Sequence, residues 1–84
     1  MNAITVYSTP WCPFCVRAKR LLTTKGLAFN DIDVSRQPNL RQEMVQLSGQ
    51  TSVPQIWLGK QHIGGCDELF ALERANKIES MLAS

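Results

Sequence analysis

Long apolar runs, a signal-like N-terminal segment and a large surplus of charge are all missing from this sequence of 84 residues. A membrane-spanning helix needs about 20 consecutive apolar residues, and no such stretch occurs. The beginning of the chain has no charged and apolar regions of the kind that secretory signals carry. We therefore expect a cytoplasmic protein without membrane contacts, although a removed presequence stays open. The formal net charge of +2 is too small to indicate a nucleic-acid partner.

The chain has only three cysteines. Three thiols cannot make a framework of disulfides, because any single pair leaves one over. In a reducing cytoplasm, a close cysteine pair is typically catalytic, redox-sensing or metal-binding. Linkers, repeats and low-complexity segments are absent as well, so the length predicts one domain over residues 1–84 with a small but sufficient core.

Acidic side chains are absent from residues 1–30, which contain the basic residues Arg17, Lys19, Arg20 and Lys25. The rest of the chain has seven acidic residues and five basic ones. The basic part carries a cysteine pair, and its charge is expected to favour a thiolate and to attract anionic thiols. For Lys19 and Lys25 individually, we expect solvated positions on a helix face.

That pair lies in the segment Trp11-Cys12-Pro13-Phe14-Cys15, between an apolar stretch and a helix-forming one. Residues three apart share one face of a helix, so the two sulfurs can meet. Pro13 suits the first helical turn, which places Cys12 at the helix N-terminus, where the dipole stabilises a thiolate. Cys15, one turn further, is expected to be less accessible. The spacing thus predicts that Cys12 attacks and Cys15 resolves, while a structural disulfide, half of a metal site and chance stay as alternatives.

Apolar periodicity predicts the element order β-α-β-α-β-β-α and an α/β fold. The expected strands cover residues 3–7, 27–34, 53–58 and 61–64, and the expected helices cover residues 13–25, 38–48 and 67–75, with a further helical turn near residues 78–82. In the second helix, Leu40, Met44 and Leu47 are spaced to face the core. A parallel pair followed by a hairpin gives a four-stranded mixed sheet with flanking helices. The first strand is expected to be central, because it delivers the cysteine loop to the carboxyl edge of the sheet.

Three short motifs carry a family resemblance: Cys-Pro-Phe-Cys at residues 12–15, Thr-Ser-Val-Pro at residues 51–54 and Gly-Gly-Cys-Asp at residues 64–67. In this order and spacing they resemble the small bacterial dithiol glutaredoxins, over residues 4–72. The resemblance implies a thioredoxin fold in its short, glutaredoxin-like form. Two departures are that Phe14 stands where the family usually has tyrosine, and that residues 8–10 lack the lysine common before the motif.

The resemblance also implies a glutathione site. It predicts a cis peptide bond before Pro54, with the backbone of Val53 turned outward to pair with a cysteine-containing peptide. It predicts that the backbone N–H groups of Cys66 and Asp67 bind the α-carboxylate of glutathione and that the Asp67 side chain binds its ammonium; Asp67 also suits an ordinary N-cap. The full set of implied glutathione-binding residues is Phe14, Arg41, Val53, Pro54, Gly65, Cys66 and Asp67, with Cys12 and Cys15 as the catalytic pair.

The function that follows from the resemblance is a glutathione-disulfide oxidoreductase, reducing protein disulfides and glutathione mixed disulfides. Glutathione would be a co-substrate and no cofactor would be bound permanently. Protein disulfides, for example in ribonucleotide reductase, would be the partners of a monomer. Two alternatives stay open: a thioredoxin-type electron donor fed by a flavoprotein reductase, and a dimer holding an iron–sulfur cluster through glutathione.

Cys66 is the third thiol, and we expect a small, partly buried apolar side chain, with a regulatory thiol as the alternative. A zinc site from Cys12, Cys15, His62 and Cys66 has a legitimate set of ligands. It lacks a second closely spaced pair, so we expect no metal and take His62 to be a strand side chain.

Four aromatic residues have expected places. Trp11 should form a wall of the site, while Trp57 and Phe29 should lie in the core. Tyr7, at the end of the first strand, should pack under the cysteine loop.

Overall fold

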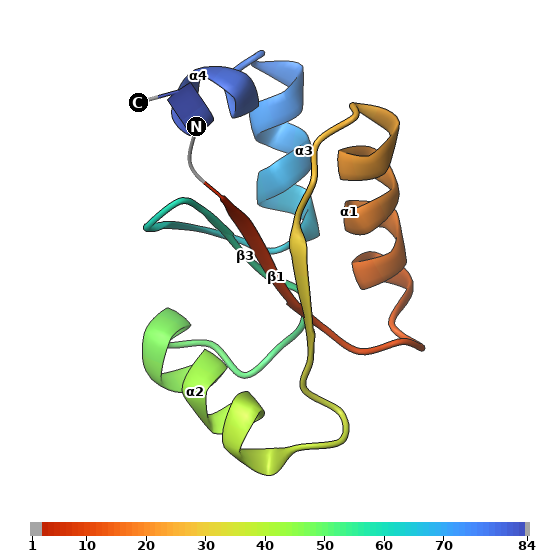
Figure 1. Ribbon diagram of the computed structural model, residues 1–84, viewed down its shortest axis with the longest axis vertical. Coiled ribbons are helices and arrows are strands. Elements are labelled where there is room, and N and C mark those ends of the chain that lie inside the picture. The colour runs from red at the N-terminus through yellow and green to blue at the C-terminus, as the bar shows by residue number, and fades with distance from the viewer. Residues whose placement is uncertain (1–2, 84) are drawn as a thin grey trace.

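The fold is seen in a computed structural model that describes residues 3–83 (Figure 1). Its strands and helices follow the predicted order, with a short fourth helix at the end. The elements are β1 (Ile4–Ser8), α1 (Pro13–Thr24), β2 (Asn30–Asp33), α2 (Pro38–Ser48), β3 (Gln55–Leu58), β4 (Gln61–Gly64), α3 (Cys66–Arg74) and α4 (Ile78–Ala83).

The four strands form one mixed sheet in the order β2-β1-β3-β4. Strand β1 pairs in parallel with β2 and antiparallel with β3, and β3 pairs antiparallel with β4. The first strand is therefore central, as predicted. The Gly59-Lys60 turn joins β3 to β4 in the predicted hairpin, with Gly59 at a positive φ of 64°.

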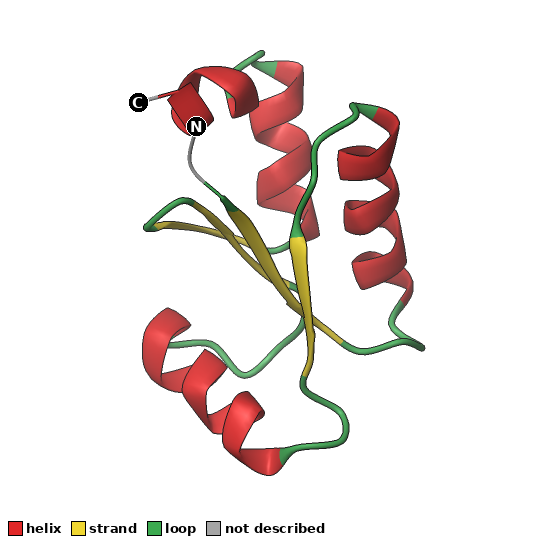
Figure 2. Cartoon of the chain, in the orientation of Figure 1, coloured by secondary structure: helices red, strands yellow, loops and turns green. Residues whose placement is uncertain are grey.

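The core is divided by the sheet, because alternate residues of a strand point to opposite faces. On one face, Val6 and Ile56 pack against α1, α3 and α4 in a cluster that includes Leu22 and Leu69. On the other face, neighbouring strand residues pack against Met44 of α2. Figure 2 shows α2 on one side of the strands and α1 with α3 on the other.

Three predicted boundaries are wrong. Strand β2 is confined to residues 30–33, because Leu27 and Phe29 pack against the core before strand pairing begins. Strand β3 begins at Gln55 instead of Val53, since proline has no N–H to donate to the sheet. Helix α3 begins at Cys66, so its N-cap is Gly65 and the N-cap expectation for Asp67 is wrong.

Some predicted burial is wrong too. In α2, Met44 is buried and Leu40 partly buried, but Leu47 is 59% exposed. Tyr7 and Trp57 pack edge to face on the α2 side of the sheet, as expected for buried aromatic side chains, with ring centroids 5.2 Å apart.

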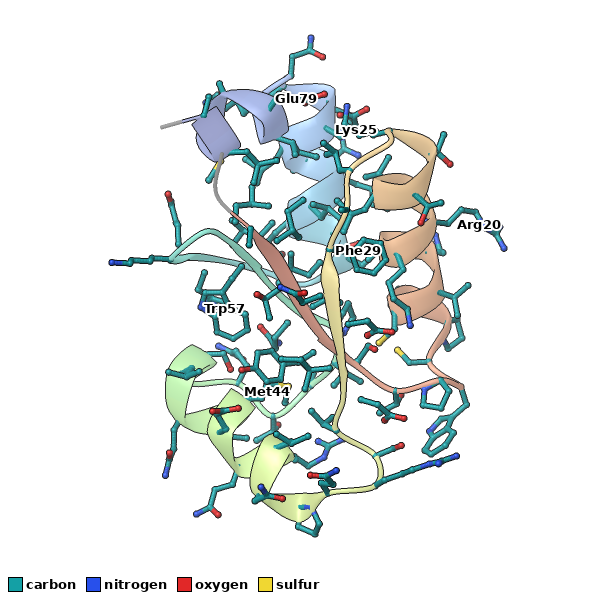
Figure 3. All side chains as sticks on the ribbon, in the orientation of Figure 1. Arg20, Lys25, Phe29, Met44, Trp57 and Glu79 are labelled. Carbon is teal, nitrogen blue, oxygen red and sulfur yellow. The ribbon has the colours of Figure 1, made fainter. Side chains whose placement is uncertain are left out.

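Both helix lysines that were expected in solvent are paired. Lys19 binds Asp31 of β2 at 2.8 Å, and Lys25 lies within 2.9 Å of both Glu73 and Glu79. Lys25 thereby ties the end of α1 to α3 and α4. Figure 3 shows Lys25 and Glu79 side by side at that end of the molecule.

Candidate redox site

Cys12 is the N-cap of α1, as the sequence predicts. Its sulfur accepts a hydrogen bond from the backbone N–H of Cys15 at 3.4 Å. The first N–H groups of a helix have no partner within it, and the helix dipole places partial positive charge at this end. These N–H groups and the dipole lie at the Cys12 sulfur, and the thiolate of a cysteine is the form that attacks disulfides.

Cys15 has the opposite environment, because its side chain is fully buried. Burial, reinforced by the hydrogen bond with Cys12, raises the pKa of Cys15 to about 12. A hydrogen bond from the Thr9 backbone and the charge of Lys19 act the other way and lower this pKa. The two sulfurs are thus unequal, with Cys12 accessible and Cys15 held as a neutral thiol.

The loop before β3 lies next to the cysteine pair. The Val53-Pro54 peptide bond is cis, as predicted. The Val53 carbonyl oxygen lies 3.7 Å from the Cys12 sulfur, within range of a weak hydrogen bond from the thiol. The chain before Val53 is anchored from α2, because Arg41 donates to the Thr51 carbonyl at 2.9 Å.

The two glycines before α3 are restricted by different neighbours. Gly64 has a φ of 110°, and a Cβ there would come within 2.7 Å of the Glu68 carboxylate. A Cβ on Gly65 would lie 3.2 Å from the Pro54 carbonyl oxygen. The Glu68 side chain accepts from the Gly65 N–H at 2.6 Å, which fixes the start of α3. The start of α3 therefore lies against the loop that holds Pro54.

A groove of about 510 Å³ lies between these segments. Six of the seven residues predicted to bind glutathione line it: Phe14, Val53, Pro54, Gly65, Cys66 and Asp67. Arg41 is not among the lining residues, so its predicted role stays a prediction. Trp11 is 73% exposed and does not line the groove either. Because Cys12 is not among the lining residues, the expectation that Trp11 walls the cysteine site stays a prediction.

Cys66 is 4% exposed and lies at the first position of α3. Burial is the main cause of its raised pKa, which the charge of Arg17 partly offsets. The sequence predicts a small, partly buried side chain, and the structure buries it more completely than that.

Sequence reasoning missed a polar network along the groove. Gln55 is 3% exposed, and its amide nitrogen donates to the Ser52 carbonyl at 3.0 Å. Its amide oxygen lies 2.7 Å from Nε2 of His62, whose ring packs on Trp57. A buried polar side chain needs hydrogen-bond partners. A glutamine at the start of an otherwise apolar strand was therefore the feature of the sequence that could have indicated this network.

Within residues 3–83, no three His, Cys, Asp or Glu side chains are grouped so as to hold a metal ion. The four residues weighed for zinc are therefore not assembled into a site. None of the helices in the same range combines the length and the apolar character that crossing a membrane requires.

The fold and the paired thiols together define a class, the thioredoxin-fold proteins with two cysteines at the start of the first helix. The Glutaredoxin family model matches residues 4–63. A glutaredoxin from Pseudomonas aeruginosa is 49% identical over 84 residues, covering 100% of both chains. Glutaredoxin 3 from Escherichia coli K12 is 42% identical over 82 residues, covering 98% of this chain and 99% of the relative.

Solved structures agree with this assignment. The solution structure of a glutaredoxin from Brucella melitensis has a TM-score of 0.86 at 50% identity, covering 98% of this chain and 89% of that one. A crystal structure of a buckwheat glutaredoxin-glutathione complex has a TM-score of 0.88 at 30% identity, covering 98% of this chain and 77% of that one. The chain belongs to the glutaredoxin family, a family of oxidoreductases, as its motifs predicted.

Proposed function

We propose that the protein is a glutathione-dependent dithiol–disulfide oxidoreductase that reduces glutathione mixed disulfides and protein disulfides. One observation carries the proposal: the Cys12 sulfur lies 3.7 Å from the carbonyl oxygen of Val53, and Val53 lines a groove that extends to the start of α3. The known complex of a buckwheat glutaredoxin with glutathione, a structural neighbour, supports glutathione as the ligand.

The groove offers complementary chemistry along the tripeptide. The N–H groups of Cys66 and Asp67 suit the α-carboxylate of the γ-glutamyl end, because a helix N-terminus favours an anion. The Asp67 carboxylate suits the neighbouring ammonium. The Val53 backbone pairs with the central cysteine, and Phe14 provides apolar contact beside it. These roles, like that of Arg41 toward the glycine end, belong to the proposal.

The reaction is exchange without a bound cofactor. The Cys12 thiolate attacks a disulfide R–S–S–R′, forms a Cys12–S–S–R bond and releases R′–S⁻, which takes up a proton. Cys15 then loses its proton and attacks Cys12, forming the internal disulfide and releasing R–S⁻; alternatively a glutathione thiolate attacks the mixed disulfide. Two glutathione molecules restore both thiols and leave as oxidised glutathione, so electrons balance.

A glutathione pool that can drive this cycle is a property of the cytoplasm, where we place the protein. The thioredoxin-type alternative is not proposed, since the relatives described above are all glutaredoxins. The dimer that holds an iron–sulfur cluster stays an alternative and is not proposed here. The test is reduction of a small glutathione mixed disulfide with glutathione, glutathione reductase and NADPH. Turnover with this electron source supports the proposal, and turnover only with thioredoxin reductase would refute it.

A further inference from the structure

The resolving step is the attack of Cys15 on the mixed disulfide at Cys12. The groove residues do not explain how Cys15 becomes reactive enough for this attack. Cys15 must become a thiolate to attack the mixed disulfide, yet its side chain is fully buried and the pKa of its thiol is raised to about 12. Some group near its sulfur has to lower the free energy of the charged form. The cysteine pair and the Thr9 backbone supply neutral or like-charged partners, so the positive charge must come from elsewhere.

Lys19 lies one helical turn after Cys15, at i+4 in α1, and therefore shares its face of the helix. Its ammonium is 2.8 Å from the Asp31 carboxylate of β2 and 3.5 Å from the Ser8 hydroxyl of β1. Asp31 is in turn bound by Ser8, whose hydroxyl donates to the other carboxylate oxygen at 2.5 Å. These contacts hold the Lys19 ammonium against β1 and β2, with 23% of its side chain exposed.

Cys15 is buried under the same face of α1, beside this end of β1. The Thr9 backbone lowers the pKa of the Cys15 thiol through a hydrogen bond, and Thr9 directly follows Ser8, whose hydroxyl lies 3.5 Å from the Lys19 ammonium. The positive charge of Lys19 favours the Cys15 thiolate, whereas a thiolate at Cys12 opposes it. That opposing charge is absent while Cys12 is bound in a mixed disulfide.

We propose that Lys19, held by Asp31 and Ser8, is a positioning residue for the resolving step and promotes ionisation of the Cys15 thiol. It acts through the Cys15 sulfur and does not touch the substrate. The step is balanced: the Cys15 proton leaves, the thiolate forms a bond to the Cys12 sulfur, the Cys12–S–R bond breaks and R–S⁻ departs. The proposal deepens the dithiol exchange described above, but it holds for any small mixed disulfide at Cys12, whether or not glutathione is preferred.

A stoichiometric reaction with dithiobis(nitrobenzoate) tests it, because each step releases one coloured thiolate. The fast phase reports attack by Cys12, and the slower, first-order phase reports attack by Cys15 on the adduct. In Lys19→Gln, we expect the second phase to slow about five-fold at each pH, a shift of about 0.7 pH unit in its profile, with the first phase unchanged. Lys19→Arg keeps the charge and should restore the second phase.

Arg20→Gln is the matched control, because Arg20 is the next residue of α1 and its side chain points into solvent (Figure 3). It removes the same charge from the same helix and should leave the second phase unchanged. The proposal is overturned if Lys19→Gln resolves at the wild-type rate, if it slows both phases equally, or if Lys19→Arg is as slow as Lys19→Gln. Loss of glutathione-coupled turnover in the wild type would instead refute the proposed function, since this reagent contains no glutathione.

Discussion

The sulfur of Cys12 lies 3.7 Å from the carbonyl oxygen of Val53, a residue 41 positions further along the chain. The contact exists because β1 and β3 are neighbours in the sheet, so the loop after β1 meets the loop before β3. It brings the attacking sulfur to a stretch of backbone that can pair with a peptide.

Because the two thiols have different environments, we expect replacing one or the other by serine to have different effects on exchange activity. Cys12→Ser should abolish exchange, because it removes the accessible sulfur at the helix N-terminus. Cys15→Ser should still reduce glutathione mixed disulfides, since free glutathione can resolve the adduct at Cys12. Coupled assays of both variants check this, and complete loss of activity in Cys15→Ser would show that the internal resolving thiol is obligatory.

The buried Cys15 thiol predicts a loss of stability in alkali. Its pKa is about 12 in the folded protein against an ordinary value of 9.0, so the folded state holds the proton more tightly. This contribution to stability is complete below about pH 9 and is lost as pH rises toward 12. Urea unfolding of the reduced protein at several alkaline pH values measures it. Cys15→Ser should show a shallower decline over the same range, and an equally steep decline would contradict the assignment.

Gly64 and Gly26 both have a positive φ, 110° and 73°, so replacing either by alanine strains the backbone. Their surroundings differ, which makes Gly26 a control for Gly64. A non-glycine residue at such angles costs about 1–3 kcal/mol. A Cβ on Gly26 meets nothing within 4 Å, whereas a Cβ on Gly64 collides with Glu68. Gly64→Ala should therefore lower the free energy of unfolding more than Gly26→Ala does, and it alone should raise the KM for glutathione by displacing the start of α3. Equal effects of the two substitutions on both quantities would refute this account of Gly64.

The buried amide of Gln55 predicts a change in glutathione affinity without a change in thiol reactivity. Gln55→Leu would leave the Ser52 carbonyl and the His62 ring without their partner, at a cost of about 1–3 kcal/mol. We expect the loop before Pro54 to loosen, with a KM for glutathione about five-fold higher. The Cys12 phase with dithiobis(nitrobenzoate) should stay the same. Gln61→Leu, at an exposed position of β4, is the control, and a matching rise in its KM would argue against a specific role for Gln55.

The sequence predicted those parts of the site that local rules determine. The apolar periods indicated the sheet and three of the helices, and Pro13 after Cys12 placed that cysteine at a helix N-terminus. The cis bond at Pro54 and the groove residues came from family resemblance, because most prolines follow trans bonds and spacing alone does not distinguish them.

The remaining features depend on which distant side chains meet. Lys19 and Asp31 come from a helix and a strand, and nothing in the helix pattern distinguishes Lys19 from Arg20. Leu47 satisfies the helical period of α2 but is 59% exposed, one residue before the helix ends. Gln55 and His62 face each other only because the β3–β4 hairpin brings them together.

The most direct measurement of the central claim is the amide NMR spectrum of the Cys15→Ser variant carrying glutathione in a mixed disulfide with Cys12. If the groove holds the tripeptide, the amides of Val53, Cys66 and Asp67 should shift strongly against the reduced variant. Blocking Cys12 with a small methylthio group should leave Cys66 and Asp67 almost unchanged, because that group cannot reach the start of α3. Indistinguishable spectra of the two adducts at Cys66 and Asp67 would contradict a glutathione-binding groove.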